Sequence, residues 1–244
     1  NTELAISSIS LFNFEFLPEF KRYTDAIIYE TSVRDLTIYP ETDVEHKGRF
    51  LGVVEKGRRS KSGALVGLDH LVKLGITHLQ LLPIFDFATV DETNIEAKYN
   101  WGYDPYSYNC LEGSFSSDPN DPFSRLKEAK EMIDEFHKNG LRVTLDVVFN
   151  HTYTFADSIY NKIVPNYFYL MDRNGNLSNG SFCGDDINKK KKMTHKYFVD
   201  MCLRYVKLLK IDGLRFDLMG ILTKDLVIDI YNKCKEVNPS FIMY

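Results

Sequence analysis

Segments with the periodicity of strands alternate with segments of helical periodicity along most of the chain, and this alternation limits the fold more than any other feature. Strands are expected at residues 25–33, 77–82, 141–148, 213–217 and 241–244, with helices at 66–74, 124–139, 193–210 and 224–237. Strand and helix in regular alternation indicate an α/β fold with a parallel sheet. A barrel and an open doubly wound sheet share this pattern. The first strand is not followed by a GxGxxG fingerprint, so a dinucleotide-binding fold is disfavoured and the long loops favour a barrel.

Two connections are much longer than ordinary links between a strand and a helix. Residues 84–122 are rich in aromatic side chains and contain YNWGYDP (Tyr99–Pro105), and residues 152–192 include two Asn-Gly turn signals. Long loops within a compact domain are usually functional or disordered, and the aromatic content argues against disorder. The run Lys189–Lys192 is interpreted as the solvated start of a helix. Residues 38–62 are polar and are interpreted as loop.

The fourth expected strand carries two charged residues within IDGLRFDLMG (Ile211–Gly220). Residues two apart in a strand share a face, so Arg215 and Asp217 point the same way. A neighbouring guanidinium favours the ionised form of a carboxyl group. Asp217 is therefore a candidate nucleophile or metal ligand rather than a proton donor, although a structural ion pair explains the spacing equally well.

Polar residues gather where the expected strands end. They are Glu30, Asp86, Asp146, His151 and Asp217. In a parallel barrel, side chains at the carboxyl ends of the strands form the active site. We therefore expect these residues at one mouth of a barrel.

Charge and composition narrow the range of partners. A net charge of -4 gives no reason to expect nucleic acid or a membrane surface as a partner. No apolar run is long enough for a membrane span. The four cysteines lack CxxC spacing, which favours neither a zinc site nor a disulfide framework and leans toward a reducing, cytoplasmic compartment.

Three of these motifs together resemble the alpha-amylase superfamily, glycoside hydrolase family 13. They are DVVFNH (Asp146–His151), GLRFDLMG (Gly213–Gly220) and YNWGYDP, the last being similar to a motif of pullulanases, which cleave α-1,6 branches in α-glucans. The resemblance implies a partial (β/α)8 TIM barrel, comprising strands 1 to 4 and the start of strand 5, with long loops after strands 2 and 3. Residues 25–244 would form the N-terminal part of a catalytic domain, and residues 1–24 form an unassigned upstream segment.

The resemblance also assigns roles to individual residues. Asp217 matches the catalytic nucleophile, and Arg215 matches the arginine that holds it. Tyr103 matches a tyrosine that stacks on the bound sugar, with Trp101 and Asp104 beside it as further substrate-binding candidates. The substrate-binding set also includes Asp146 and His151, from the first conserved region. We expect Asp146 to share Arg215 with Asp217 and to be ionised, and we expect Trp101 and Tyr103 to lie near His151 and Asp217.

A retaining glycosidase needs a second carboxyl group as general acid, about 5–5.5 Å from the nucleophile. In the family this acid is a glutamate at the end of the fifth strand, so the resemblance implies an acid beyond Tyr244 and an inactive isolated chain. Asn150 matches a residue that binds calcium in many amylases; no cofactor is otherwise expected. The stretch Phe182–Asp185 stands where pullulanases usually carry Gly-Cys-Gly-Asn.

The favoured function is thus a pullulanase-like glycosidase that acts on α-glucan polysaccharides or oligosaccharides by retaining double displacement. Isoamylase-type debranching and amylase activity are alternatives within the superfamily, as is a non-catalytic member that binds glucan or supports assembly. A metal-dependent hydrolase using Asp146, His151 and Asp217 as ligands is a third class.

Overall fold

The computed structural model describes residues 14–244, and a five-stranded parallel sheet forms its centre. The strands are β1 (Ile28–Thr31), β2 (His78–Leu81), β5 (Arg142–Val147), β6 (Gly213–Phe216) and β7 (Ile242–Met243). They lie in the order β1-β2-β5-β6-β7, so each new strand is added beside the previous one. A doubly wound sheet would reverse direction partway. The predicted partial barrel is therefore confirmed, and the sheet of the described residues is not closed.

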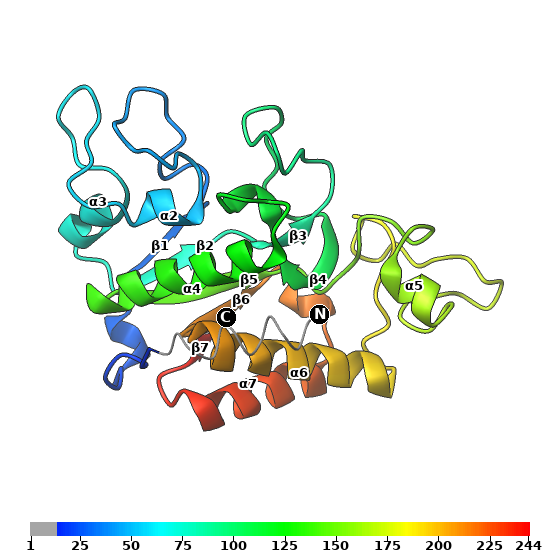
Figure 1. Cartoon of the computed structure of the whole chain (residues 1–244). Coiled ribbons are helices and arrows are strands. Elements are labelled where there is room, and N and C mark those ends of the chain that lie inside the picture. The colour runs from blue at the N-terminus through cyan, green and yellow to red at the C-terminus, as the bar shows by residue number, and fades with distance from the viewer. Residues whose placement is uncertain (1–13) are drawn as a thin grey trace.

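The four predicted helices are present, each within two residues of its expected ends. They are α3 (Gly67–Leu74), α4 (Pro122–Lys138), α6 (Lys192–Leu209) and α7 (Lys224–Val237). Figure 1 shows α4, α6 and α7 running alongside one another next to the sheet. Helix α4 starts sharply because the Asp121 carboxylate caps the amide of Phe123 and Pro122 occupies the first turn. None of the described helices is long and apolar enough to cross a membrane.

The long connections contain elements that the sequence pattern did not predict. Within residues 84–122, β3 (Phe85–Phe87) pairs antiparallel with β4 (Pro105–Leu111), followed by η2 (Gly113–Phe115). The region 38–62, predicted to be loop, includes α2 (Phe50–Val53), and the second long excursion includes α5 (Ile159–Ile163). A further short helix, η3 (Met219–Ile221), follows β6. Asp86 belongs to β3 and so lies in this hairpin rather than directly at the end of a sheet strand; its place at the barrel mouth stays a prediction.

Residues 14–26 form a strap across the amino ends of the strands. Phe14 meets the ring of His137 edge-on, and the Phe20 amide donates to Ser240 Oγ at 2.7 Å. In η1 (Tyr23–Asp25), the hydroxyl of Tyr23 lies 2.9 Å from that of Tyr231 on α7. The segment left unassigned by the sequence thus packs on the barrel from residue 14 onward, while residues 1–13 lie outside the described part of the chain.

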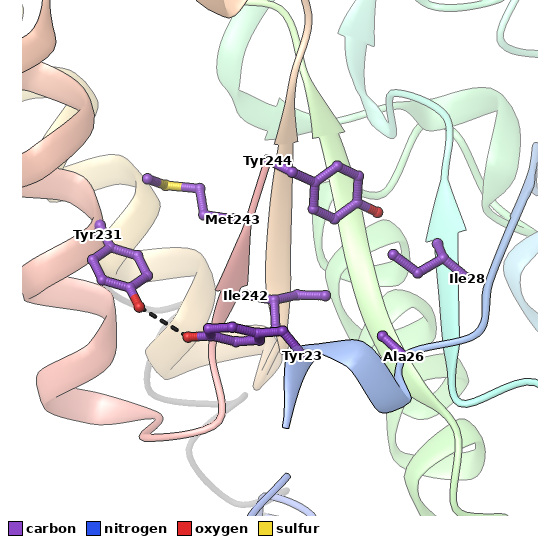
Figure 2. A pocket seen from close by; sticks show the side chains of 7 residues that line it. All are labelled: Tyr23, Ala26, Ile28, Tyr231, Ile242, Met243 and Tyr244. Carbon is purple, nitrogen blue, oxygen red and sulfur yellow. Dashed lines mark hydrogen bonds between the residues drawn. The ribbon is translucent and has the colours of Figure 1, made fainter. Parts of the chain in front are cut away.

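A groove opens beside the strap, between the outer strands β1 and β7. It is lined by Tyr23, Ala26, Ile28, Tyr231, Ile242, Met243 and Tyr244. Figure 2 shows these side chains around the groove, with the hydroxyls of Tyr23 and Tyr231 facing each other. The lining is mostly apolar, so the strap and the two outer strands of the sheet share one hydrophobic surface.

The amino end of the sheet also contains a buried histidine that should make the fold sensitive to acid. His78 is fully buried on β2, where its ring meets Phe20 edge-on. Burial lowers the pKa of His78 to about 4, with Asp212 opposing and Arg142 reinforcing the shift. The unfolded chain therefore binds a proton more readily than the folded chain, and stability is lost as the pH falls through about 6.5 toward 4.

We predict that wild type loses about 2 kcal/mol more stability than His78→Leu between about pH 7.5 and about pH 5, since leucine has no proton to take up. Urea unfolding at the two pH values measures this difference. His195→Leu, which removes a solvent-accessible histidine of α6, serves as the control. Equal losses in wild type and His78→Leu would contradict the assignment.

Candidate functional site

The pairing of β5 with β6 brings the charged residues of the site together. Asp146 on β5 lies directly beside Arg215 on β6 in the parallel register, and the Asp217 amide continues the ladder by donating to Val147 O at 3.0 Å. Gly213 makes this close pairing possible, because a Cβ there would lie 2.7 Å from Ile242 and 2.8 Å from Thr144. The carboxyl ends of two adjacent strands thus present three charges side by side.

One arginine serves both carboxylates. Arg215 Nη1 lies 2.9 and 3.1 Å from the oxygens of Asp146 and 3.2 Å from Asp217 Oδ1. The predicted pair of Arg215 and Asp217, with Asp146 sharing the arginine, is confirmed. The Asp146 side chain is fully buried, whereas that of Asp217 is 20% exposed. Of the two carboxylates, Asp217 is the one that a ligand can reach.

Tyr103 completes the surroundings of Asp146. Its hydroxyl donates to Asp146 Oδ2 at 2.7 Å, and burial together with the Asp146 charge raises the pKa of Tyr103, so the phenol keeps its proton. Burial also raises the pKa of Asp146 to about 6, although Tyr103 and Arg215 both oppose the shift. Asp146 is ionised at neutral pH, as expected, but it is much closer to its titration point than an aspartate paired with arginine in water.

His151 is held against the backbone of the aromatic loop. Its Nε2 lies 2.9 Å from the Tyr103 carbonyl, which can only accept, so Nε2 carries the proton. Burial lowers the pKa of His151, and its buried Nδ1 has no hydrogen-bond partner. The predicted approach of Tyr103 to His151 is confirmed. At neutral pH the ring is uncharged and keeps one unused acceptor.

Trp101 and Asp104, the other two candidates from the loop, differ in their surroundings. Trp101 is 63% exposed and meets the Tyr99 ring edge-on at 6.4 Å; its approach to Asp217 stays a prediction. The Asp104 carboxylate accepts from Asn100 Nδ2 at 2.9 and 3.1 Å, and burial raises its pKa. Asp104 therefore holds its own loop in shape.

Asn150 was predicted only as a match to a calcium-binding residue, and Lys189 was not among the predicted site residues. Asn150 Nδ2 donates to the backbone oxygen of Asp217 at 2.9 Å and to its Oδ2 at 3.1 Å. Lys189 Nζ donates to the Asn150 carbonyl at 3.2 Å. Burial lowers the pKa of Lys189 to about 8, so the side chain remains charged at neutral pH. The solvated helix start predicted for Lys189–Lys192 is wrong at Lys189, which is buried, because the preceding loop folds back onto Asn150.

The backbone takes a left-handed conformation at a residue next to Asp217 and at a residue of the second long connection. Leu218, directly after Asp217, has φ 48°, and Phe182 has φ 60° and is 90% exposed. Such conformations are costly for residues with a side chain and gather at functional sites. Phe182 opens the stretch that departs from the pullulanase-like sequence, so an exposed ring stands where glycine is usual.

Within the described part of the chain, one group of three carboxylates is spaced closely enough to hold a metal. Ligand oxygens of Asp86, Glu92 and Glu112 lie within 4.8 Å of one another. Arg125 already pairs with Glu92 at 3.0 Å, and burial raises the pKa of Asp86 to about 6 and of Glu112 to about 7. The negative charge of the cluster is thus partly neutralised, by the Arg125 guanidinium and by proton uptake at the carboxylates with raised pKa.

The geometry suits attack by a carboxylate. Asp217 is accessible, oriented by Asn150 and paired with Arg215, whereas Asp146 is fully buried and Asp104 is bonded to Asn100 of its own loop. The guanidinium between Asp146 and Asp217 supplies the cation that a metal would otherwise provide, which disfavours the metal-ligand set of Asp146, His151 and Asp217. The described site therefore offers one accessible carboxylate, at Asp217, without a matched proton donor.

Known proteins resemble the chain in sequence and in fold. Residues 55–182 match the family model "Alpha amylase, catalytic domain". The chain is 40% identical to a pullulanase of Bacillus subtilis (strain 168) over 228 residues, covering 93% of this chain and 32% of that protein.

A pullulanase from Anoxybacillus sp. LM18-11, complexed with maltotetraose, superposes with a TM-score of 0.91 at 41% identity, covering 95% of this chain and 34% of that one. A pullulanase from Paenibacillus barengoltzii, in complex with maltohexaose and alpha-cyclodextrin, gives a TM-score of 0.89 at 42% identity, covering 92% and 35%. The chain spans about a third of the length of these relatives.

Proposed function

The chain belongs to the alpha-amylase family, and from this premise we propose that it forms part of a pullulanase-type glycosidase that cleaves α-1,6 linkages in α-glucans. The observation that carries the proposal is the accessible Asp217 carboxylate, paired with Arg215 beside the buried Asp146. The relatives of the chain that are named pullulanase support the α-1,6 linkage as the one that is cleaved.

In the proposed reaction, Asp217 Oδ attacks the anomeric carbon of the sugar on the non-reducing side of the branch. A carbon–oxygen ester bond to the enzyme forms as the glycosidic bond breaks, and the leaving oxygen takes up a proton from a general acid. Water then attacks the same carbon and releases Asp217, with net retention of configuration. We assign no described residue to the acid step.

The neighbouring residues position the nucleophile and the sugar. Arg215 keeps a positive charge beside Asp217 before attack, and Asn150 fixes the carboxylate through Oδ2. The Tyr103 hydroxyl holds Asp146, and buried, neutral His151 supports the Tyr103 backbone through Nε2, so both help to position the loop that would contact the sugar. Solved relatives complexed with maltotetraose and maltohexaose support α-1,4-linked glucose oligomers as the ligand class, with Trp101 as an exposed stacking surface.

A substrate panel with the full-length protein tests the proposal. We expect pullulan to be converted to maltotriose while linear amylose is left intact, as measured by reducing ends and product mass. Cleavage of amylose would indicate an amylase instead. Retention on amylose resin without hydrolysis of either glucan would indicate a non-catalytic member used for binding.

A further inference from the structure

We propose that the ammonium of Lys189 is a built-in cation of the site, bonded to the carbonyl of Asn150, the residue that the family resemblance matches to a calcium ligand. The loop behind Asp217 would thus be held without a metal ion at that position. The inference uses no step of the proposed reaction, and it concerns a residue that the sequence motifs leave unassigned.

The Asn150 carbonyl has no lone pair left for a metal. Lys189 Nζ donates to this oxygen at 3.2 Å and the Ile187 amide donates to it at 2.9 Å. A carbonyl oxygen has two lone pairs, and both are used here. The Asn150 side chain is also committed, because its amide nitrogen donates to Asp217. Calcium takes six to eight oxygen ligands at about 2.3–2.6 Å, which this arrangement does not provide.

The charges around Lys189 match a single ammonium. Lys189 is 7% exposed, and the carboxylate that favours its charge is Asp186. Asp186 is itself fixed by Ser178 Oγ and the Gly180 amide, both at 2.6 Å, and its backbone bridges to His151. His151 faces the same positive charge, which disfavours its own protonation. A divalent cation added beside the ammonium would be repelled.

The loop keeps one feature of a cation site. Asn150 Oδ1 is buried and has no hydrogen-bond partner. An amide oxygen of this kind is a common calcium ligand. It stays unused while the ammonium holds the neighbouring carbonyl, and it becomes available if Lys189 is replaced by an acidic residue. The same loop should therefore accept calcium once the lysine is gone.

Melting temperatures of the full-length protein, measured with added calcium chloride or with EDTA, test the proposal. Lys189→Met should lower the melting temperature by about 5 °C in either condition, because a buried carbonyl loses a charged donor. Lys189→Arg keeps the charge and should recover at least half of that loss. The matched control is Lys190→Met, which removes an exposed neighbour and should shift melting by no more than about 1 °C.

Lys189→Asp provides the decisive comparison. It removes the ammonium and adds a carboxylate to the segment that returns to Asn150, so its melting temperature should rise with calcium by several degrees more than that of wild type. Taking the difference from wild type cancels calcium binding at the Asp86, Glu92 and Glu112 cluster. Equal calcium responses in wild type and Lys189→Asp would overturn the proposal, as would a Lys189→Met protein as stable as Lys190→Met.

Discussion

Replacement of Asp217 by asparagine is expected to lower the rate of pullulan hydrolysis by at least about 10⁴-fold, as for the loss of a nucleophile in other covalent catalysts. Asparagine keeps the size and the contact with Asn150 but cannot form the glycosyl ester. The change should fall on kcat, because the groups that face the sugar remain. Release of reducing ends from pullulan by the full-length protein measures the effect.

Two further measurements separate lost chemistry from lost structure. Asp225→Asn, on the exposed first turn of α7, changes an aspartate in the same way far from the charged cluster and should leave the rate unchanged. Asp217→Asn should still bind maltotetraose in a calorimetric titration. Hydrolysis by Asp217→Asn within tenfold of wild type would show that another group is the nucleophile.

Removal of the shared arginine is expected to destabilise the fold by about 3–5 kcal/mol near pH 8, because Arg215→Met leaves the buried Asp146 charge without its cation. Only the Tyr103 hydroxyl would remain as its partner. The Asp146 carboxyl can escape this penalty by taking up a proton. Chemical denaturation of the variant at several pH values measures the loss.

The pH dependence follows from the pKa of Asp146, which burial already raises to about 6 and which loss of Arg215 would raise further. The folded variant then binds a proton more readily than its unfolded chain, so its stability relative to wild type should recover as the pH falls toward 5. Arg204→Met, on the surface of α6, is the matched control. A loss that is independent of pH would contradict the role of Asp146 as the orphaned charge.

The charged centre was predictable because it depends on short-range rules. A spacing of two places Arg215 and Asp217 on one face, and sequential addition of parallel strands places Asp146 next to them. The hydrophobic periodicity of the helices likewise predicted both ends of α7 at the residues where the structure has them. Conclusions of this kind need no knowledge of where the long loops go.

The features that the sequence did not predict depend on the three-dimensional course of the long loops. The β3–β4 hairpin lacks a short turn signal, since its strands are joined by a long aromatic segment, and so its pairing of Asp86 with Ser107 was not predictable. Lys189 sits in a lysine run that suggests solvent, and only the return of residues 186–189 to Asn150 buries it. The roles of the site residues, the boundary at residue 25 and the cytoplasmic location stay predictions.

The strap across the amino ends of the strands also has a consequence for the order of assembly. Its hydrogen bonds join residues at opposite ends of the described chain, with Phe20 bonded to Ser240 and Tyr23 to Tyr231. Closing so long a loop costs conformational entropy before any contact can offset that cost. On the ribosome, these bonds cannot form until β7 has emerged. The strap is made before every strand that it contacts and therefore docks late, so its apolar rings stay exposed to chaperones and proteases throughout that interval.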